Sequence, residues 1–231
     1  MKTIGLLGGM SWESTAHYYR LLNQGINQKL GGLHSAKIAM ISVDFQPLEI
    51  LMQQGKWTEC GACLAESARK IEAAGADFIL LCTNTMHKVA EIITQAVDIP
   101  LLHIADATAE RIKAEKIQSV GLLGTSFTME EEFYKGRLLE KHGLRVIIPC
   151  QEDRKIVHDI IFEELCRGKI RTESRRRYLN IIEAMNKQGA EAIIAGCTEI
   201  GMLINQNHTI VPLFDTTFLH VEQAVCLALA E

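Results

Sequence analysis

The chain has 231 residues, 48% of them hydrophobic and only four of them proline, which suits one large core or two domains of about 115 residues. Its formal net charge of −4 provides no excess of positive charge for binding nucleic acid or an anionic membrane. One basic cluster, Arg171 to Arg177, is interrupted by Glu173 and is more typical of a solvated helix face.

The sequence also indicates where the protein works. No apolar run reaches the roughly 18 residues that a membrane helix needs, and the first residues lead into a strand rather than a signal peptide. The seven cysteines are an odd number and are scattered, so we expect reduced thiols. We therefore expect a cytoplasmic protein that binds neither membranes nor nucleic acid.

The predicted elements alternate between strand and helix. In the first half, strands are expected from residue 4 to the glycine turn, then at 37–43, 77–81 and 100–104, and helices at 11–28, 47–54, 57–74, 85–97 and 106–116. In the second half, strands are expected from 119, then at 144–148, 192–195 and 210–214, and helices at 128–142, 153–166, 172–188 and 215–230. Ser11, Asp106 and Asp215 are the expected helix caps.

Two landmarks recur in the same order in both halves of the chain. Gly-Leu-Leu-Gly begins at residues 5 and 121, and Gly-Ala-acid begins at 75 and 189, so the separations are 70 and 68 residues. We therefore predict an α/β fold of two pseudo-symmetric lobes, each with a four-stranded parallel sheet flanked by helices, and an active site in the cleft between them. The expected lobes are residues 1–98 with the helix at about 215–231, and residues 99–214.

The predicted site is organised around Gly196-Cys197-Thr198-Glu199, which follows a short buried strand. Open α/β sheets place their chemistry at the carboxyl ends of strands. A gapless alignment of the two Gly-Ala-acid landmarks sets Thr83 opposite Cys197, so we expect a facing, unequal pair. A helix start after Cys197 is expected to lower the pKa of its thiol and to supply thiolate near neutral pH. An inert buried cysteine is the alternative.

Each half also carries a glycine turn after its first strand. The turn at Gly8-Gly9 lacks the Gly-x-Gly-x-x-Gly spacing of dinucleotide sites, so a tight turn or a site for a small carboxylate is favoured. The second turn adds three hydroxyl groups, from Thr125, Ser126 and Thr128, which suit a carboxylate.

The remaining cysteines and histidines have simpler interpretations. Cys60 and Cys63 form a Cys-x-x-Cys inside a predicted helix without the second pair that zinc needs, so helix packing is expected. His87 is expected to support the loop at Thr83, and His103 to be a core histidine. No metal site is predicted. Three further cysteines are expected to be buried thiols: Cys150, Cys166 and Cys226.

Taken together, these segments resemble the cofactor-independent aspartate/glutamate racemase family over nearly the whole chain. The resemblance is carried by the opening Gly-Leu-Leu-Gly-Gly-Met, the loop Thr83-Asn84-Thr85-Met86-His87, the turn Gly124-Thr125-Ser126, and Gly196-Cys197-Thr198-Glu199. It implies a homodimer of two-lobed subunits that racemises a small amino-acid substrate without pyridoxal phosphate or another cofactor.

Family members use two cysteines on opposite faces of the substrate α-carbon. The resemblance therefore implies that Cys197 attacks the L enantiomer and that Thr83, which replaces the first cysteine, is its weaker partner. Cys82 comes one residue early, and its side chain should point to the opposite side. The substrate-binding residues implied are Met10, Asn84, Thr85, Thr125, Ser126, Thr128, Thr198, Glu199, Gln53 and Arg167.

Specificity is less closely defined by the sequence. The basic residue that aspartate racemases commonly carry after the second strand is absent between Asp44 and Gln54, where Gln46, Gln53 and Gln54 are the polar candidates. Either Cys166 or Arg167 aligns with a second basic position. L-Aspartate and L-glutamate are the favoured substrates. The alternatives are a hydantoin racemase, a maleate isomerase, a decarboxylase that uses Cys197 alone, or a non-catalytic carboxylate-binding protein.

Overall fold

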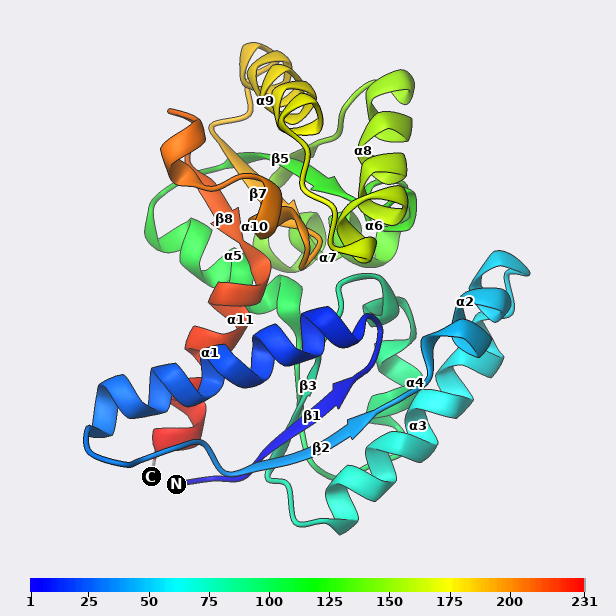
Figure 1. Ribbon diagram of the computed structural model, residues 1–231, viewed down its shortest axis with the longest axis vertical. Helices are drawn as coiled ribbons and strands as arrows, with labels where there is room; N and C mark the ends of the chain where they lie inside the picture. The colour runs from blue at the N-terminus through cyan, green and yellow to red at the C-terminus, as the bar shows by residue number, and fades with distance from the viewer. Residues whose placement is uncertain (231) are drawn as a thin grey trace. The chain divides into compact units, whose positions relative to one another are not determined.

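The computed structural model describes residues 1–230, and the chain divides into two compact units (Figure 1). The first unit comprises Met1–Ile104 with His220–Glu231, and the second comprises Ala105–Leu219. Both divisions lie inside helices, namely α5 (Ile104–Ala114) and α11 (Thr216–Leu229). Residue 231, at the end of the expected last helix, lies outside the described residues.

The first unit is built on a parallel sheet of four strands in the order β2-β1-β3-β4. Its central strands are fully buried and apolar, as expected for a parallel sheet covered on both faces, whereas β2 is a half-buried edge strand. The strands are β1 (Ile4–Gly8), β2 (Ile38–Ser42), β3 (Phe78–Leu81) and β4 (Leu101–Leu102). The helices are α1 (Trp12–Leu30), α2 (Phe45–Gln53), α3 (Trp57–Ala73), the 3-10 helix η1 (Thr85–Val89) and α4 (Ala90–Thr94).

The second unit repeats this arrangement with the strand order β6-β5-β7-β8, again all parallel. The predicted α/β fold with two four-stranded parallel sheets is therefore confirmed. The strands are β5 (Ser119–Gly124), β6 (Arg145–Ile147), β7 (Ala192–Gly196) and β8 (Leu213–Asp215). The helices are α6 (Ser126–Glu130), α7 (Glu132–His142), α8 (Gln151–Glu163), η2 (Leu165–Arg167), α9 (Thr172–Lys187), α10 (Ile200–Leu203) and η3 (Gln206–His208).

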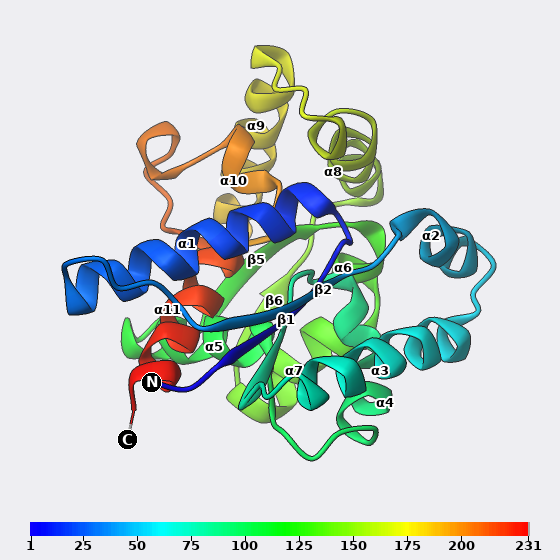
Figure 2. The same cartoon turned by 60° about the horizontal axis from the view of Figure 1, so that its bottom comes forward.

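Each sheet is covered by helices whose apolar faces form a core. In the first unit, α1 and the part of α11 after His220 lie together beside β1 (Figure 2). Tyr18, Leu22 and Ile26 supply the apolar face of α1, at the helical spacing that buries one side. In the second unit, α8 and α9 pack against β5 and β7, with Tyr178 among the largest fully buried side chains.

Several predicted helices are shorter than expected. The helix predicted at 85–97 is a 3-10 turn followed by one short α-helix, and the helix predicted at 128–142 is broken at Glu131. Glu131 has extended backbone angles (φ −88°, ψ 154°), which end α6 and begin α7. The strand predicted at 100–104 is only two residues long, because Ile104 already begins α5.

The predicted caps have mixed outcomes. Ser11 accepts a hydrogen bond from the backbone N–H of Ser14, and Asp215 accepts from those of Thr217 and Phe218, so these two caps are confirmed. Asp106 is wrong as a cap, because it lies inside the first turn of α5.

The Asp106 carboxylate instead ties α5 to α7. It accepts hydrogen bonds from Arg137 at 2.7 Å, Lys141 at 2.7 Å and His142 at 2.8 Å. Burial raises the pKa of Asp106, but the bonds from these three side chains outweigh it and hold the pKa well below its usual value. Asp106 therefore stays ionised and fixes the start of the second unit.

Candidate functional site

The first glycine turn connects β1 to α1 through a backbone conformation that only glycine adopts easily. Gly9 has φ +96°, and a Cβ atom there would clash with the carbonyl oxygen of Val43. Its N–H donates to Thr15 Oγ1 at 2.7 Å, so this amide is already used inside the turn. Met10 follows and is buried. The turn is thus shaped by close backbone packing.

The loop after β3 separates Cys82 from Thr83. Cys82 is fully buried among the core residues of the first unit, and burial raises the pKa of its thiol. Cys82 therefore points into the core of the first unit, as expected from its place one residue before Thr83. The carbonyl of Cys82 accepts a hydrogen bond from Ser14 Oγ at 3.1 Å, which ties the loop to α1. Thr83, Asn84 and Thr85 are all buried.

His87 holds the backbone of Thr83 in place. Its Nδ1 lies 2.8 Å from the Thr83 carbonyl oxygen, and its Nε2 lies 3.2 Å from the backbone nitrogen of Ile104. A carbonyl oxygen accepts and a backbone N–H donates, so the proton must be on Nδ1 and the ring is neutral. His87 therefore links the loop after β3 to the start of α5, as expected of a supporting residue.

The other histidines of this unit extend the same buried region. His103 is buried with its ring centroid 4.4 Å from that of His87, although it follows β4 rather than lying within it. His220 accepts from the Tyr18 hydroxyl at Nδ1 (2.9 Å) and donates from Nε2 to the carbonyl of Leu102 (2.8 Å). Burial lowers the pKa of His220 to about 4.

The second glycine turn, between β5 and α6, is largely satisfied by its own side chains. Thr125 Oγ1 accepts the N–H of Thr128 at 3.3 Å and lies 3.2 Å from the Thr128 hydroxyl, which is fully buried. The N–H of Ser126 donates to Nδ1 of His158 at 3.1 Å. The backbone N–H groups of Ser126 and Thr128 and the hydroxyls of Thr125 and Thr128 were expected to face a carboxylate, but each has a partner within the protein. The Ser126 side chain is half-buried.

Close contact between β5 and β7 explains the glycine before Cys197. Gly124 and Gly196 are register partners, and a Cβ atom on Gly124 would lie 2.8 Å from the Gly196 carbonyl oxygen. A Cβ atom on Gly196 would lie 2.9 Å from the Leu123 carbonyl oxygen. The strand end thus brings its backbone close to β5 and places Cys197 directly beyond it.

Strand register also tests the gapless alignment of the two halves. Leu7 of β1 pairs with Leu81 of β3, and Leu123 of β5 pairs with Ala195 of β7. Leu7 and Leu123 hold the same place in the repeated Gly-Leu-Leu-Gly, and Thr83 and Cys197 each follow the paired residue by two positions. The two residues therefore occupy equivalent positions, each within its own unit.

Cys197 is hydrogen-bonded to the carboxylate of Glu199. Its Sγ donates to Glu199 Oε2 at 3.0 Å, and the Thr198 hydroxyl donates to the same oxygen at 2.6 Å. Cys197 is 9% exposed and Glu199 only 4% exposed. A thiol and a carboxylate are thus held together at the end of β7, with little contact to solvent.

The predicted lowering of the Cys197 pKa is wrong. Burial raises the pKa of this thiol, and the neighbouring Glu199 carboxylate and Cys166 thiol raise it further. The helix that was expected to stabilise thiolate is α10, which has only four residues and begins at Ile200. Cys197 is consequently a thiol at rest rather than a preformed thiolate.

The candidates for binding a substrate side chain are more exposed. Gln53 is exposed and its side-chain amide donates to Glu49 Oε1. Arg167 is also exposed, at the end of η2. Cys166 is half-buried, and burial together with the Glu199 carboxylate raises its pKa to about 12. Of the two aligned alternatives, Cys166 is therefore the one that interacts with the Cys197 region.

The other cysteines differ partly from expectation. Cys60, on α3, is buried as predicted, but Cys63 is exposed on the same helix. Cys150 and Cys226 were expected to be buried and are exposed, the first at the N-cap of α8 and the second on α11. Sequence reasoning also missed Ser14 and His158, whose contacts come from distant parts of the chain and leave no local motif.

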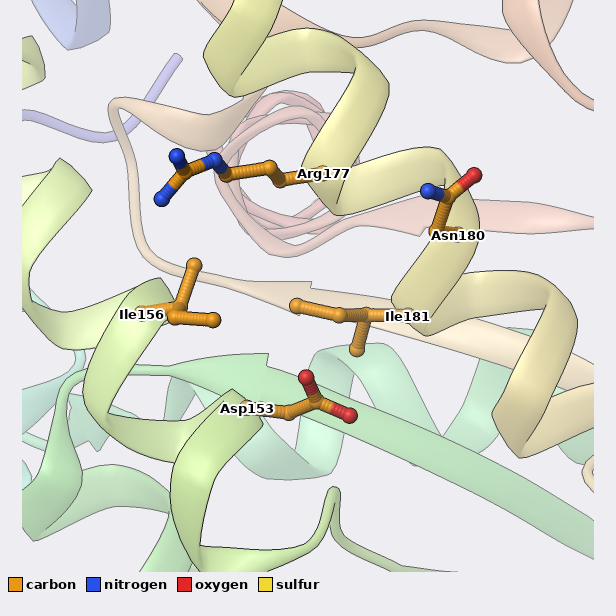
Figure 3. A pocket seen from close by; sticks show the side chains of 5 residues that line it. All are labelled: Asp153, Ile156, Arg177, Asn180 and Ile181. Carbon is orange, nitrogen blue, oxygen red and sulfur yellow. The ribbon is translucent and has the colours of Figure 1, made fainter.

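Neither a metal centre nor a membrane span is found in the described chain. Residues 1–230 contain no group of three or more His, Cys, Asp or Glu side chains placed to hold a metal ion. The helices among them include none long and apolar enough to span a membrane. A pocket lies between side chains of α8 and α9 (Figure 3). It is lined by Asp153, Ile156, Arg177, Asn180 and Ile181.

Comparisons with known proteins agree with this arrangement. The sequence profile of the Asp/Glu/Hydantoin racemase family matches residues 7–224. The broad specificity amino-acid racemase RacX of Bacillus subtilis (strain 168) is 23% identical over 235 residues, covering 98% of each chain. A solved structure from Yersinia pestis, provisionally named an Asp/Glu racemase, is 52% identical with a TM-score of 0.94 and covers all of both chains.

A second solved structure extends the likeness to a more distant protein. An aspartate racemase homologue from Pyrococcus horikoshii OT3 is 32% identical, with a TM-score of 0.85 and 99% of each chain covered. The family profile and these relatives span nearly the whole chain, including both strand-end loops. The chain therefore belongs to the Asp/Glu/Hydantoin racemase family, and the protein is a racemase, an enzyme of the isomerase class.

Proposed function

We propose that this racemase inverts the α-carbon of acidic amino acids, with L-aspartate and L-glutamate as preferred substrates, and that it needs no cofactor. The observation that carries the proposal is the equivalence of Thr83 and Cys197 after β3 and β7, fixed by the strand registers within each unit. Family membership supplies the reaction class, and the two equivalent loops supply one proton-transferring side chain each.

In this proposal the two side chains act unequally. Cys197 removes the α-proton of the L enantiomer, and Thr83 completes protonation on the opposite face. A threonine hydroxyl is a far weaker acid than a thiol, whose reference pKa is about 8.5. Attack on the D enantiomer is therefore much slower to begin, although the equilibrium between the enantiomers is unchanged, since a catalyst lowers the barrier shared by both directions.

The substrate side chain is proposed to be held loosely. Gln53 and Arg167 are both exposed, so neither forms a rigid buried clamp before substrate binds. Arg167 can recruit a carboxylate as a bidentate partner when one is present. The name of the Bacillus subtilis relative, a broad specificity amino-acid racemase, agrees with relaxed specificity. We also propose a homodimer, which light scattering coupled to gel filtration tests.

Deuterium exchange at Cα tests the proposed function. The enzyme is incubated in D2O with L-aspartate, L-glutamate and their D enantiomers, and Cα–H loss is followed by NMR while chiral chromatography measures inversion. Exchange from the L enantiomers that is faster than from the D enantiomers is expected. A 5-substituted hydantoin is the comparison substrate, because the family name includes hydantoin racemases. Exchange of the hydantoin alone would reject the amino-acid proposal.

A further inference from the structure

The carboxylate beside Cys197 has a chemical task that substrate binding does not explain. We propose that Glu199 is the proton acceptor for the Cys197 thiol, so that the two side chains form one acid–base unit that holds a single proton. The inference rests on the proposed function, since it explains how Cys197 becomes a base. It assigns to Glu199 a catalytic role in place of the substrate-binding role expected from the sequence.

The hydrogen bonds around Glu199 define the starting state. Cys197 Sγ and Thr198 Oγ1 both donate to Oε2, at 3.0 and 2.6 Å. An ionised carboxylate has only acceptor positions, so in the proposed resting state one of its oxygens takes both donors. The resting unit is therefore S–H with carboxylate, and it carries one negative charge.

An internal transfer avoids placing two negative charges side by side in this buried site. The pKa of Cys197 is raised by burial and by Glu199, because a thiolate beside a carboxylate would place two negative charges in a poorly solvated site. Moving the proton 3.0 Å from Sγ to Oε2 leaves the charge of the unit unchanged. In the proposal, Sγ and Oε2 therefore share one proton.

Two other ionisable groups face Cys197 from neighbouring elements, and neither is able to accept its proton. Cys166 comes from η2, and burial raises its pKa to about 12. Tyr178 comes from α9, and burial followed by the Cys197 and Cys166 thiols raises its pKa well above its usual value. Both stay protonated near neutral pH, so Glu199 is the neighbour able to accept the thiol proton.

The cycle balances when each proton is followed. The Cys197 proton moves to Glu199, which gives thiolate and carboxylic acid. The thiolate then takes the α-proton of the substrate and becomes a thiol again, while the bonding electron pair stays on the substrate. A proton is delivered to the opposite face of Cα from the Thr83 side. Glu199 releases its proton to solvent, and the Thr83 side takes one up, which restores the resting state.

Two measurements on Glu199→Gln test the pair. Gln keeps the shape of the side chain but accepts no proton, and Glu183→Gln, an exposed site on α9, is the matched control. The first measurement is Cα–deuterium exchange from L-glutamate near neutral pH. The second is alkylation of Cys197 by iodoacetamide across pH, quantified by peptide mass spectrometry because Cys63, Cys150 and Cys226 are exposed.

The two readouts are expected to move in opposite directions. Exchange should fall on the order of 100-fold or more, the usual contribution of a proton-transferring side chain, because burial still keeps the thiol protonated and its acceptor is gone. Alkylation should reach half its maximal rate at a lower pH than in wild type, because the negative charge beside the thiol has been removed. Glu199→Asp, which keeps a carboxylate, should recover part of the exchange.

Other outcomes overturn the proposal. Faster exchange together with easier alkylation would mean that Glu199 only suppresses the thiolate. Lost exchange with an unchanged alkylation profile, in a variant whose circular dichroism is normal, would mean that Glu199 only positions other groups. If the wild-type enzyme exchanges no Cα proton of an amino acid, the proposed function fails. The pH profile of Cys197 alkylation then tests the pair by itself: the same profile in Glu199→Gln and in wild type would reject the proton-sharing pair as well.

Discussion

The loops after β3 and β7 occupy equivalent places in two similar sheets, yet different interactions hold them. The first loop is fixed through its backbone, because Ser14 donates to the Cys82 carbonyl and His87 donates to the Thr83 carbonyl. In the second loop a side chain at the equivalent position is itself held, because Cys197 Sγ donates to Glu199. The two halves of the chain therefore share the position of this side chain, whereas the hydrogen bonds around it differ between them.

The largest expected effect comes from removing the thiol. Cys197→Ser should abolish detectable Cα exchange, a loss on the order of 100- to 10,000-fold, because it removes the proposed base. Deuterium exchange with L-glutamate measures it. Cys82→Ser is the control, since this thiol is buried in the core: it should keep most activity while losing about 1–3 kcal/mol of stability from an added buried hydroxyl. The opposite pattern would shift the assignment to Cys82.

Thr83→Cys should make the two loops more alike. The reaction that starts from the D enantiomer gains a base that it lacked, so its initial rate should rise on the order of 100-fold. The reaction that starts from the L enantiomer gains only a better proton donor. Initial rates from each enantiomer, in wild type and variant, measure the difference. Thr83→Ser, which keeps a hydroxyl, should change the two directions little. Equal gains in both directions would contradict an unequal pair.

A smaller loss is expected when the backbone support of Thr83 is removed. His87→Ala deletes both the donor to the Thr83 carbonyl and the acceptor for the Ile104 N–H. Displacement of a reacting group by about 1 Å can cost about 100-fold, so we expect a 10- to 100-fold lower kcat with a smaller change in KM. His87→Asn, which retains a donor near Nδ1, should recover part of the rate. Equal losses in both variants would argue against this support role.

The last expected effect concerns stability rather than rate. His220 titrates at about 4 in the folded protein against an ordinary 6.5, so unfolding takes up a proton between these values. The contribution of neutral, buried His220 to the free energy of unfolding is complete above pH 6.5 and is lost as the pH falls toward 4. The loss is at most about 3 kcal/mol. Urea unfolding of wild type and His220→Gln at several pH values measures it. A variant with the same pH dependence as wild type would reject this assignment.

The sequence predicted the sheets and the equivalence of Thr83 and Cys197 because both follow from short-range patterns. Gly-Leu-Leu-Gly marks a buried strand and its turn in each half, and a strand register carries that alignment across the sheet. The place of Cys82 in the core was also predictable, since neighbouring side chains of an extended segment point to opposite sides.

The electrostatics of the site could not be predicted in the same way. A cysteine before a helix usually has a lowered pKa, but this outcome depends on helix length, on burial and on where Glu199 points. Asp106 shows the same limit. Its sequence position suits a cap, but Arg137, Lys141 and His142 reach it from more than 30 residues away. Side-chain partners brought together by folding leave no local pattern.

The division of the chain inside α11 has a consequence for the order of events during synthesis. The second unit is one continuous segment, Ala105–Leu219, whereas the first is completed only by residues after His220. Val221, Ala224 and Val225 fill the core beside α1, and the N–H of Lys2 bonds to the carbonyl of Ala228. On the ribosome, the segment made first must therefore wait for the last residues, and the unit that begins later can finish folding earlier.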